Sequence, residues 1–148
     1  MVYQSAIVVE ARSWIGTSFH HQGRVKKNAT SKGGCDCIGL IIGVTSALGI
    51  KCKGYSLAQL DNKNYSKHPD GVSLKAALDE YLTPIPVNSI QPGDVLLIRF
   101  NKEPQHVAFV GDYGGGLSLI HCYIQARGVV EHVLDDYWME RVVGAYSL

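Results

Sequence analysis

Cys37, His106 and His121 are the residues of this 148-residue chain whose types and placement could carry out a reaction. Cys37 directly follows Asp36, at the start of an apolar segment that is expected to form a helix. With Asp36 as N-cap, Cys37 takes the first helical position, where unpaired backbone N–H groups and the helix dipole stabilise a thiolate. We therefore expect a lowered pKa for the Cys37 thiol, as in a thiol nucleophile.

His106 and His121 lie on two expected strands that a glycine-rich turn connects. If residues 111–116 form this turn symmetrically, His106 faces His121 directly across the hairpin, with Cβ atoms about 4.5–5.5 Å apart. A one-residue shift in the pairing would separate the two imidazoles. We expect Cys37 to be the nucleophile, His106 the general base and acid, and His121 the residue that orients the His106 ring. The backbone N–H of Cys37 is then a natural oxyanion donor.

The other cysteines leave alternatives open. Cys35 is a rival nucleophile, but it precedes the helix cap and lacks the field of the helix N-terminus. The four cysteines could form two disulfides, although free thiols are expected because a chain of this size needs no such framework. Cys35 and Cys37 are too close in sequence for a usual zinc-ligand pair, and His121-Cys122 completes no zinc pattern. We expect neither a metal nor another cofactor.

The elements around these residues predict an α+β fold, with helices first and an antiparallel sheet afterwards. Glycines and polar side chains at 16–35 indicate a long loop, and residues 51–72 are polar and irregular. Gly39 and Gly43 fall on one face of the buried helix and are expected to let it approach the sheet closely. Apolar spacing predicts helices at 4–15, 37–48 and 73–82, and strands at 95–100, 106–110, 117–122, 129–134 and 141–146.

Composition and charge restrict the class of protein. With 46% hydrophobic and 18% charged residues and a net charge of +1, the sequence predicts one globular domain spanning 1–148. It offers no membrane-spanning segment, no secretion signal and no strongly basic stripe for nucleic acid. The stretch 12–35 is basic and contains no acid. It is read either as a solvated loop or as a surface for an anionic partner.

Several motifs together resemble the NlpC/P60 cysteine peptidases. The likeness to the three catalytic motifs of that family rests on segments 36–40, 106–111 and 120–121. The phage branch of the family looks most similar, and its likeness extends to segments 11–17, 21–23, 34–37 and 92–95 and to the region of Trp138. Single motifs of this kind are weak signals, but their order and spacing make them a strong one.

The resemblance implies a papain-like fold and hydrolysis of peptide bonds in cell-wall stem peptides, commonly between D-glutamate and a diamino acid. It also implies a protein made in the cytoplasm, incorporated into a phage tail or gene-transfer particle and acting on the wall. Because stem peptides are anionic, Arg24, Lys26 or Lys27 are candidates for binding their carboxylates. Many family members carry a tyrosine that helps form the oxyanion site, where this chain has Phe19. We expect oxyanion or substrate-binding residues among Asp36, His20, His21, Gln22 and Arg24.

Two other functions compete with this interpretation. Phe19 favours a catalytically weak tail structural or wall-binding module that keeps a peptidase-like fold. Thiol chemistry could also serve acyl transfer or amide hydrolysis on another substrate, because a fold does not determine a substrate.

Overall fold

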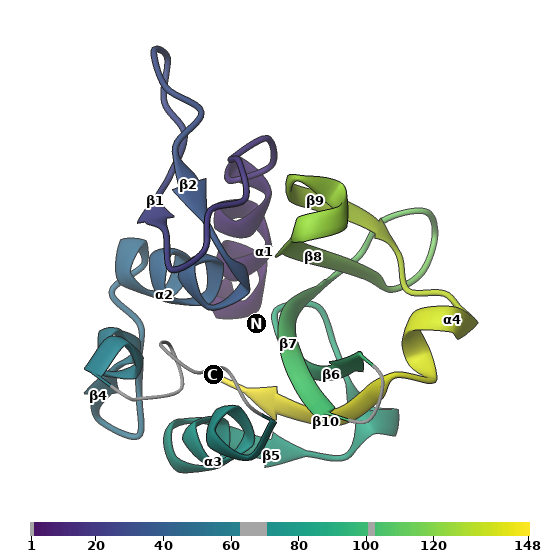
Figure 1. Ribbon diagram of the computed structural model, residues 1–148. Helices are drawn as coiled ribbons and strands as arrows, with labels where there is room; N and C mark the ends of the chain where they lie inside the picture. The colour runs from purple at the N-terminus through teal and green to yellow at the C-terminus, as the bar shows by residue number, and fades with distance from the viewer. Residues whose placement is uncertain (1, 63–70, 101–102) are drawn as a thin grey trace.

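A computed structural model describes residues 2–62, 71–100 and 103–148 and confirms the α+β arrangement. Figure 1 shows α1 and α2 on one side of a sheet and the short α4 on the other. The structure places α-helices α1 at Val2–Ser13, α2 at Cys37–Ala47, α3 at Gly71–Tyr81 and α4 at Asp136–Met139, with short 3-10 helices η1 at Leu57–Asn62, η3 at Val87–Ser89 and η4 at Ile124–Ala126. No helix in the described ranges is both long and apolar enough to span a bilayer.

The main sheet has six antiparallel strands in the order β5-β10-β6-β7-β8-β9. Its strands are β5 (Thr83–Ile85), β6 (Val95–Phe100), β7 (Glu103–Gly111), β8 (Ser118–Tyr123), β9 (Gly128–Val133) and β10 (Val142–Ser147). Two small hairpins precede it: β1 (Arg24–Val25) with β2 (Gly34–Cys35), and β3 (Lys51–Cys52) with β4 (Tyr55–Ser56). The first hairpin lies within the expected long loop 16–35 and projects from the body of the molecule (Figure 1).

Most predicted elements are found within two or three residues of their expected bounds. The strands β1 to β5 were missed because they are two or three residues long and show no alternation that a sequence reveals. The third helix, expected to begin at residue 73, already begins at Gly71 as α3. Part of the expected irregular stretch, residues 63–70, lies outside the described residues.

The sheet buries both of its faces. Val107, Phe109 and Ile120 pack with α1, α2 and α3 in the larger core. Ala108, Val110 and Leu119 point the opposite way, into a smaller core that Trp138 of α4 covers. This division agrees with the alternation expected for the hairpin of β7 and β8.

Gly39 and Gly43 let α2 pack closely, but not against the sheet as the sequence suggested. A Cβ at Gly43 would lie 2.3 Å from two ring atoms of Trp14, which belongs to the turn after α1. A Cβ at Gly39 would lie 2.2 Å from the carbonyl oxygen of Gly23. The glycine face of α2 therefore receives the end of α1 and the loop before β1.

Gly43→Ala is expected to lower the free energy of unfolding by about 1–3 kcal/mol, because the added methyl must displace the buried Trp14 ring. Chemical denaturation of the purified variant measures this loss. Ser46→Ala, at an exposed position of the same helix, is the control and should stay within about 0.5 kcal/mol of wild type. Equal stability of Gly43→Ala and wild type would contradict the close packing.

Candidate active site

The N-terminus of α2 is built on the Asp36 carboxylate. Its Oδ1 accepts hydrogen bonds from the Gly39 backbone N–H and from Nη1 of Arg24, both at 2.8 Å. Its Oδ2 accepts the backbone N–H of Gln22, also at 2.8 Å. Asp36 is thus the N-cap, as expected, and it also ties the loop before β1 to the helix. This side chain therefore has a structural role at the site in addition to any contact with substrate.

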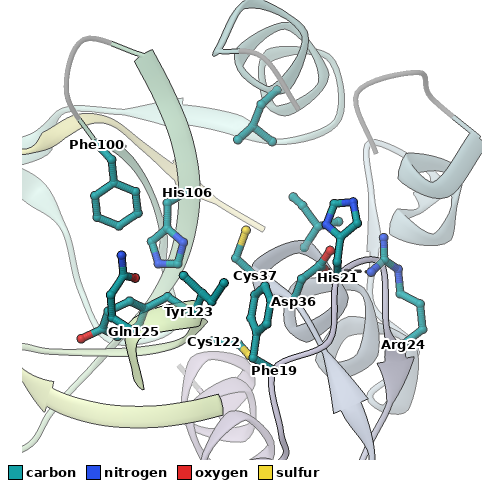
Figure 2. Close-up of a pocket in the computed structure, with 13 residues that line it drawn as sticks. Phe19, His21, Arg24, Asp36, Cys37, Phe100, His106, Cys122, Tyr123 and Gln125 are labelled. Atoms are coloured by element: carbon teal, nitrogen blue, oxygen red, sulfur yellow. Dashed lines mark hydrogen bonds and ion pairs between the residues drawn. The ribbon is translucent and has the colours of Figure 1, made fainter. Parts of the chain in front are cut away.

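Cys37, the first residue of α2, lines a pocket of about 390 Å³. Figure 2 shows its sulfur lying between the Asp36 side of the pocket and the His106 ring. The backbone N–H of Val107 is near enough to the thiol to lower its pKa, so the sulfur lies beside the strand position next to His106. The other described residues that line the pocket are Phe19, His21, Arg24, Asp36, Ile38, Leu74, Phe100, His106, Cys122, Tyr123, Ile124 and Gln125.

His106 and His121 meet, but through a different register from the expected one. The observed pairs Phe109↔Ile120 and Gly111↔Ser118 shift the hairpin by two residues. Continued along the ladder, this register makes the two histidines diagonal neighbours rather than direct partners. Because the shift is even, both side chains stay on the same face, and Nε2 of His106 lies 2.6 Å from Nδ1 of His121.

Burial sets the electrostatics of the pair, and it overturns the expected lowering of the Cys37 pKa. Burial, followed by the charge of Asp36, raises the pKa of the thiol to about 12, and Arg24 offsets only part of this. Burial also lowers the pKa of His106 to about 3. The helix N-terminus favours a thiolate, but desolvation and the nearby carboxylate outweigh it. Desolvation therefore favours a neutral thiol and a neutral imidazole in the site without substrate.

The remaining cysteines are free thiols in other surroundings. Cys35 is fully buried and does not line the pocket. Cys122 lines the pocket wall, and its thiol donates a hydrogen bond of 3.1 Å to the Cys35 carbonyl oxygen. Cys52 lies in the small β3-β4 hairpin. Cys37 alone among the four stands at a helix N-terminus.

The five expected oxyanion or substrate-binding residues do not all reach the pocket. His21, Arg24 and Asp36 line it, whereas His20 and Gln22 do not. Phe19 lies at the pocket wall, held by bridges that its backbone and that of Ser18 make with β2 and β9. Figure 2 shows the His21 ring on the same side of the pocket as Asp36 and Arg24.

Much of the basic stretch 12–35 is paired within the protein. Nε of Arg12 lies 2.8 Å from Oε1 of Glu131, which joins α1 to β9. Nζ of Lys26 lies 3.1 Å from Oε2 of Glu10, beside Trp14. Lys26 and Lys27 do not line the pocket, so of the three cations expected to bind substrate only Arg24 is placed to do so.

The structure adds Phe100, Tyr123 and a third histidine, which the sequence did not single out, and it brings Trp138 beside them. Phe100 and Tyr123 line the pocket, and Trp138 packs against the rings of both candidate catalytic histidines. Nε2 of His132 lies 2.8 Å from Nε2 of His121. β8 pairs with β9 so that Leu119 lies opposite His132, and His121 is two residues further along β8. The sequence could not reveal that His121 and His132 are close, because this depends on how β8 and β9 align. Among the described residues, no group of histidines, cysteines and carboxylates converges as metal ligands would.

Comparison with known proteins gives one family and one fold. The model of the NlpC/P60 family matches residues 16–147. A search of the curated proteins finds no match. Among solved structures, the NlpC/p60 domain of the peptidoglycan hydrolase SagA is similar, with a TM-score of 0.63, 22% identity and 98% of each chain covered.

Two further structures share the fold. An NlpC/P60 family protein from Bacillus cereus has a TM-score of 0.65 and 17% identity, and the match covers 96% of this chain but only 39% of that one. An N-acetylmuramoyl-L-alanine amidase from Bacteroides uniformis has a TM-score of 0.58 and 10% identity, and the match covers 99% of this chain and 98% of that one. At these identities the similarity establishes the fold, which is the expected papain-like NlpC/P60 fold.

The reactivity of Cys37 toward an alkylating reagent is expected to rise roughly tenfold per pH unit between pH 7 and 9 without a plateau. The reason is that only the thiolate reacts and the pKa lies near 12, far above this range. The measurement is the rate of labelling, located at Cys37 by peptide mass spectrometry. A labelling rate that reaches a plateau near pH 7 would contradict this pKa and support the lowered Cys37 pKa that the sequence suggested.

Substitutions of the ion pair beside the thiol should shift that rate in opposite directions. Arg24→Gln removes a charge that lowers the pKa of Cys37, so labelling at pH 8 should be slower. Asp36→Asn removes a charge that raises it, so labelling should be faster, and asparagine still caps the helix. Lys75→Gln, in a surface ion pair with Asp79, serves as the control with an unchanged rate. Slower labelling of Asp36→Asn would contradict this account.

Proposed function

The chain belongs to the NlpC/P60 family, and on this premise we propose that it is a cysteine peptidase that cleaves stem peptides of bacterial peptidoglycan. One observation carries the proposal: Cys37, at the N-terminus of a buried helix, shares a pocket with His106, whose ring is held by His121. Figure 2 supports the assignment, because one ring nitrogen of His106 is turned toward Cys37. The proposed roles are nucleophile for Cys37, general base and acid for His106, and orienting residue for His121.

The reaction follows from the neutral state of the site. As Sγ of Cys37 attacks the substrate carbonyl carbon, the thiol proton passes to Nδ1 of His106, and charge develops on the carbonyl oxygen. The tetrahedral intermediate collapses when the C–N bond breaks and His106 returns the proton to the leaving amine. Water then attacks the thioester carbonyl and gives one proton to His106. The C–S bond then breaks, the acid leaves, and His106 returns the proton to Sγ of Cys37.

The pocket suits an anionic peptide. Arg24 brings a guanidinium to its wall, although this group is paired with Asp36, and His21 supplies a further polar side chain. Stem peptides carry carboxylates that such groups bind. Within this substrate class we propose the bond between D-glutamate and a diamino acid. We further propose that the protein is made in the cytoplasm, joins a phage tail or gene-transfer particle and cuts the wall locally.

Purified wall peptides incubated with wild type should yield new fragments that Cys37→Ala fails to produce, because no other thiol stands at the helix N-terminus. Mass spectrometry of the fragments identifies the bond that is cut. Cys35→Ser and Cys52→Ser are the matched thiol controls and should retain most of the activity. Equal loss of activity in Cys35→Ser and Cys37→Ala would exclude Cys37 as the specific nucleophile. Products in which no peptide bond has been cut would indicate amide or acyl chemistry.

Phe19 supports a second candidate, a wall-binding module with little turnover. Its ring lines the pocket but cannot donate a hydrogen bond to an oxyanion. Retained binding of the wall by a protein that yields no fragments would favour this candidate over the peptidase.

Phe19→Tyr tests whether the oxyanion site is short of a donor. If the new hydroxyl reaches the oxyanion, kcat should rise by about tenfold or more, because a single donor is worth about 10²–10³ when it is fully aligned. Steady-state kinetics on a purified stem peptide gives kcat and KM separately. An unchanged kcat would indicate that another group, such as His21, already donates there.

A further inference from the structure

Three histidine rings form a line that runs from the pocket on β7, across β8, to the edge strand β9. His106 contacts His121 through Nε2 and Nδ1 at 2.6 Å, and His121 contacts His132 through Nε2 and Nε2 at 2.8 Å. The last ring ends on a carbonyl, since Nδ1 of His132 lies 3.0 Å from the backbone oxygen of Val133. His106 and His121 are buried, whereas His132 is partly exposed.

The carbonyl at the end of this line dictates where each proton lies. A carbonyl oxygen only accepts, so Nδ1 of His132 carries the hydrogen, and Nε2 of the neutral ring is an acceptor. His121 must then donate from Nε2, which leaves its Nδ1 as an acceptor. His106 must in turn donate from Nε2, so its Nδ1 holds the free lone pair. In this arrangement the other five ring nitrogens along the line each have a complementary partner.

We propose that His132 is a positioning residue that acts through His121: its acceptor nitrogen fixes the tautomer of His106 and leaves Nδ1 free to take the proton of Cys37. This inference deepens the proposed function and rests on its assignment of the base. Without His132, the Nε2–H of His121 would lose its acceptor, and the opposite tautomer of both inner rings would become accessible. In that tautomer Nδ1 of His106 carries a proton and cannot act as a base.

Aromatic rings pack around the line of histidines, and its two inner rings are buried. Trp138 lies with its ring centroid 5.0 Å from that of His121 and 5.2 Å from that of His132. Tyr123 stacks on His121 at 4.6 Å with an interplanar angle of 21°. Burial also keeps His106 and His121 neutral by lowering the pKa of each. Because His121 is fully buried, its N–H needs an acceptor within the protein, and the proton order depends on the neighbouring nitrogen.

Two substitutions separate this role from simple packing. His132→Gln loses the aromatic ring but offers an amide oxygen near the position of Nε2, so it can still accept from His121. His132→Phe keeps a ring against Trp138 but has no acceptor. The proposal expects Gln to resemble wild type and Phe to lose function, whereas a packing role expects the reverse.

The first measurement is ¹⁵N NMR of histidine-labelled protein at neutral pH, which reads the protonated nitrogen of each ring without any substrate. Wild type and His132→Gln should show His106 protonated at Nε2, and His132→Phe should show the Nδ1–H form or a mixture. A wild-type His106 protonated at Nδ1, or an unchanged tautomer in the folded Phe variant, would overturn the proposal. This readout holds even if wall peptides are not the substrate.

The second measurement is the kinetics of stem-peptide cleavage. His132→Phe should lower kcat by about 10- to 100-fold with little change in KM. This is expected for a residue that orients the His106 ring through His121 and does not itself contact the substrate. His132→Gln should restore most of kcat. If His132→Gln loses as much kcat as His132→Phe while its thermal stability equals that of wild type, acceptance by His132 does not matter for the reaction.

Discussion

The desolvation of polar groups is the constraint on which the rest of this site depends. A half-buried carboxylate, a half-buried thiol and two buried imidazoles lie where the helix N-terminus meets the sheet, and partners within the protein offset the loss of their hydration. Asp36 finds three donors, from α2, from the loop before β1 and from Arg24. Its ion pair with Arg24 partly offsets the effect of the Asp36 charge on the pKa of Cys37. The loop, the helix and the pocket wall are thus held by one side chain.

The same burial decides the chemistry that the site can perform. Desolvation disfavours charge on both the thiol and the imidazole, so it works against a separated thiolate–imidazolium pair before substrate binds. Proton transfer from Cys37 to His106 is then expected to accompany the attack on a carbonyl rather than precede it. Charge appears only when the substrate is present and the oxyanion donors are engaged. In the proposed reaction, the thiol would stay protonated between turnovers, and the rate would depend on the tautomer of His106.

Packing around α2 explains how the helix that carries Cys37 lies so close to the loop before β1 and to the end of α1. The helix has no side chain at Gly39 and Gly43, where a loop carbonyl and the Trp14 ring fill the space. Arg12 fastens α1 to the far edge of the sheet through Glu131, which also accepts a hydrogen bond from Ser118. These contacts involve Arg12 and Glu131, whose charges the sequence alone would allow to bind a partner molecule. Most of the basic character of the stretch 12–35 therefore serves the fold.

The sequence by itself determined the α+β class, the long helices, most strands of the main sheet, the Asp36 cap and the pairing of His106 with His121 on one face. These features depend on local periodicity and on the even alternation of strands, which survives a two-residue shift in register. Only the tertiary structure decided the sign of the Cys37 pKa shift, the internal pairing of the cations and the place of His132. Desolvation, ion pairing and contact between β8 and β9 depend on segments far apart in the chain, so no local pattern encodes them.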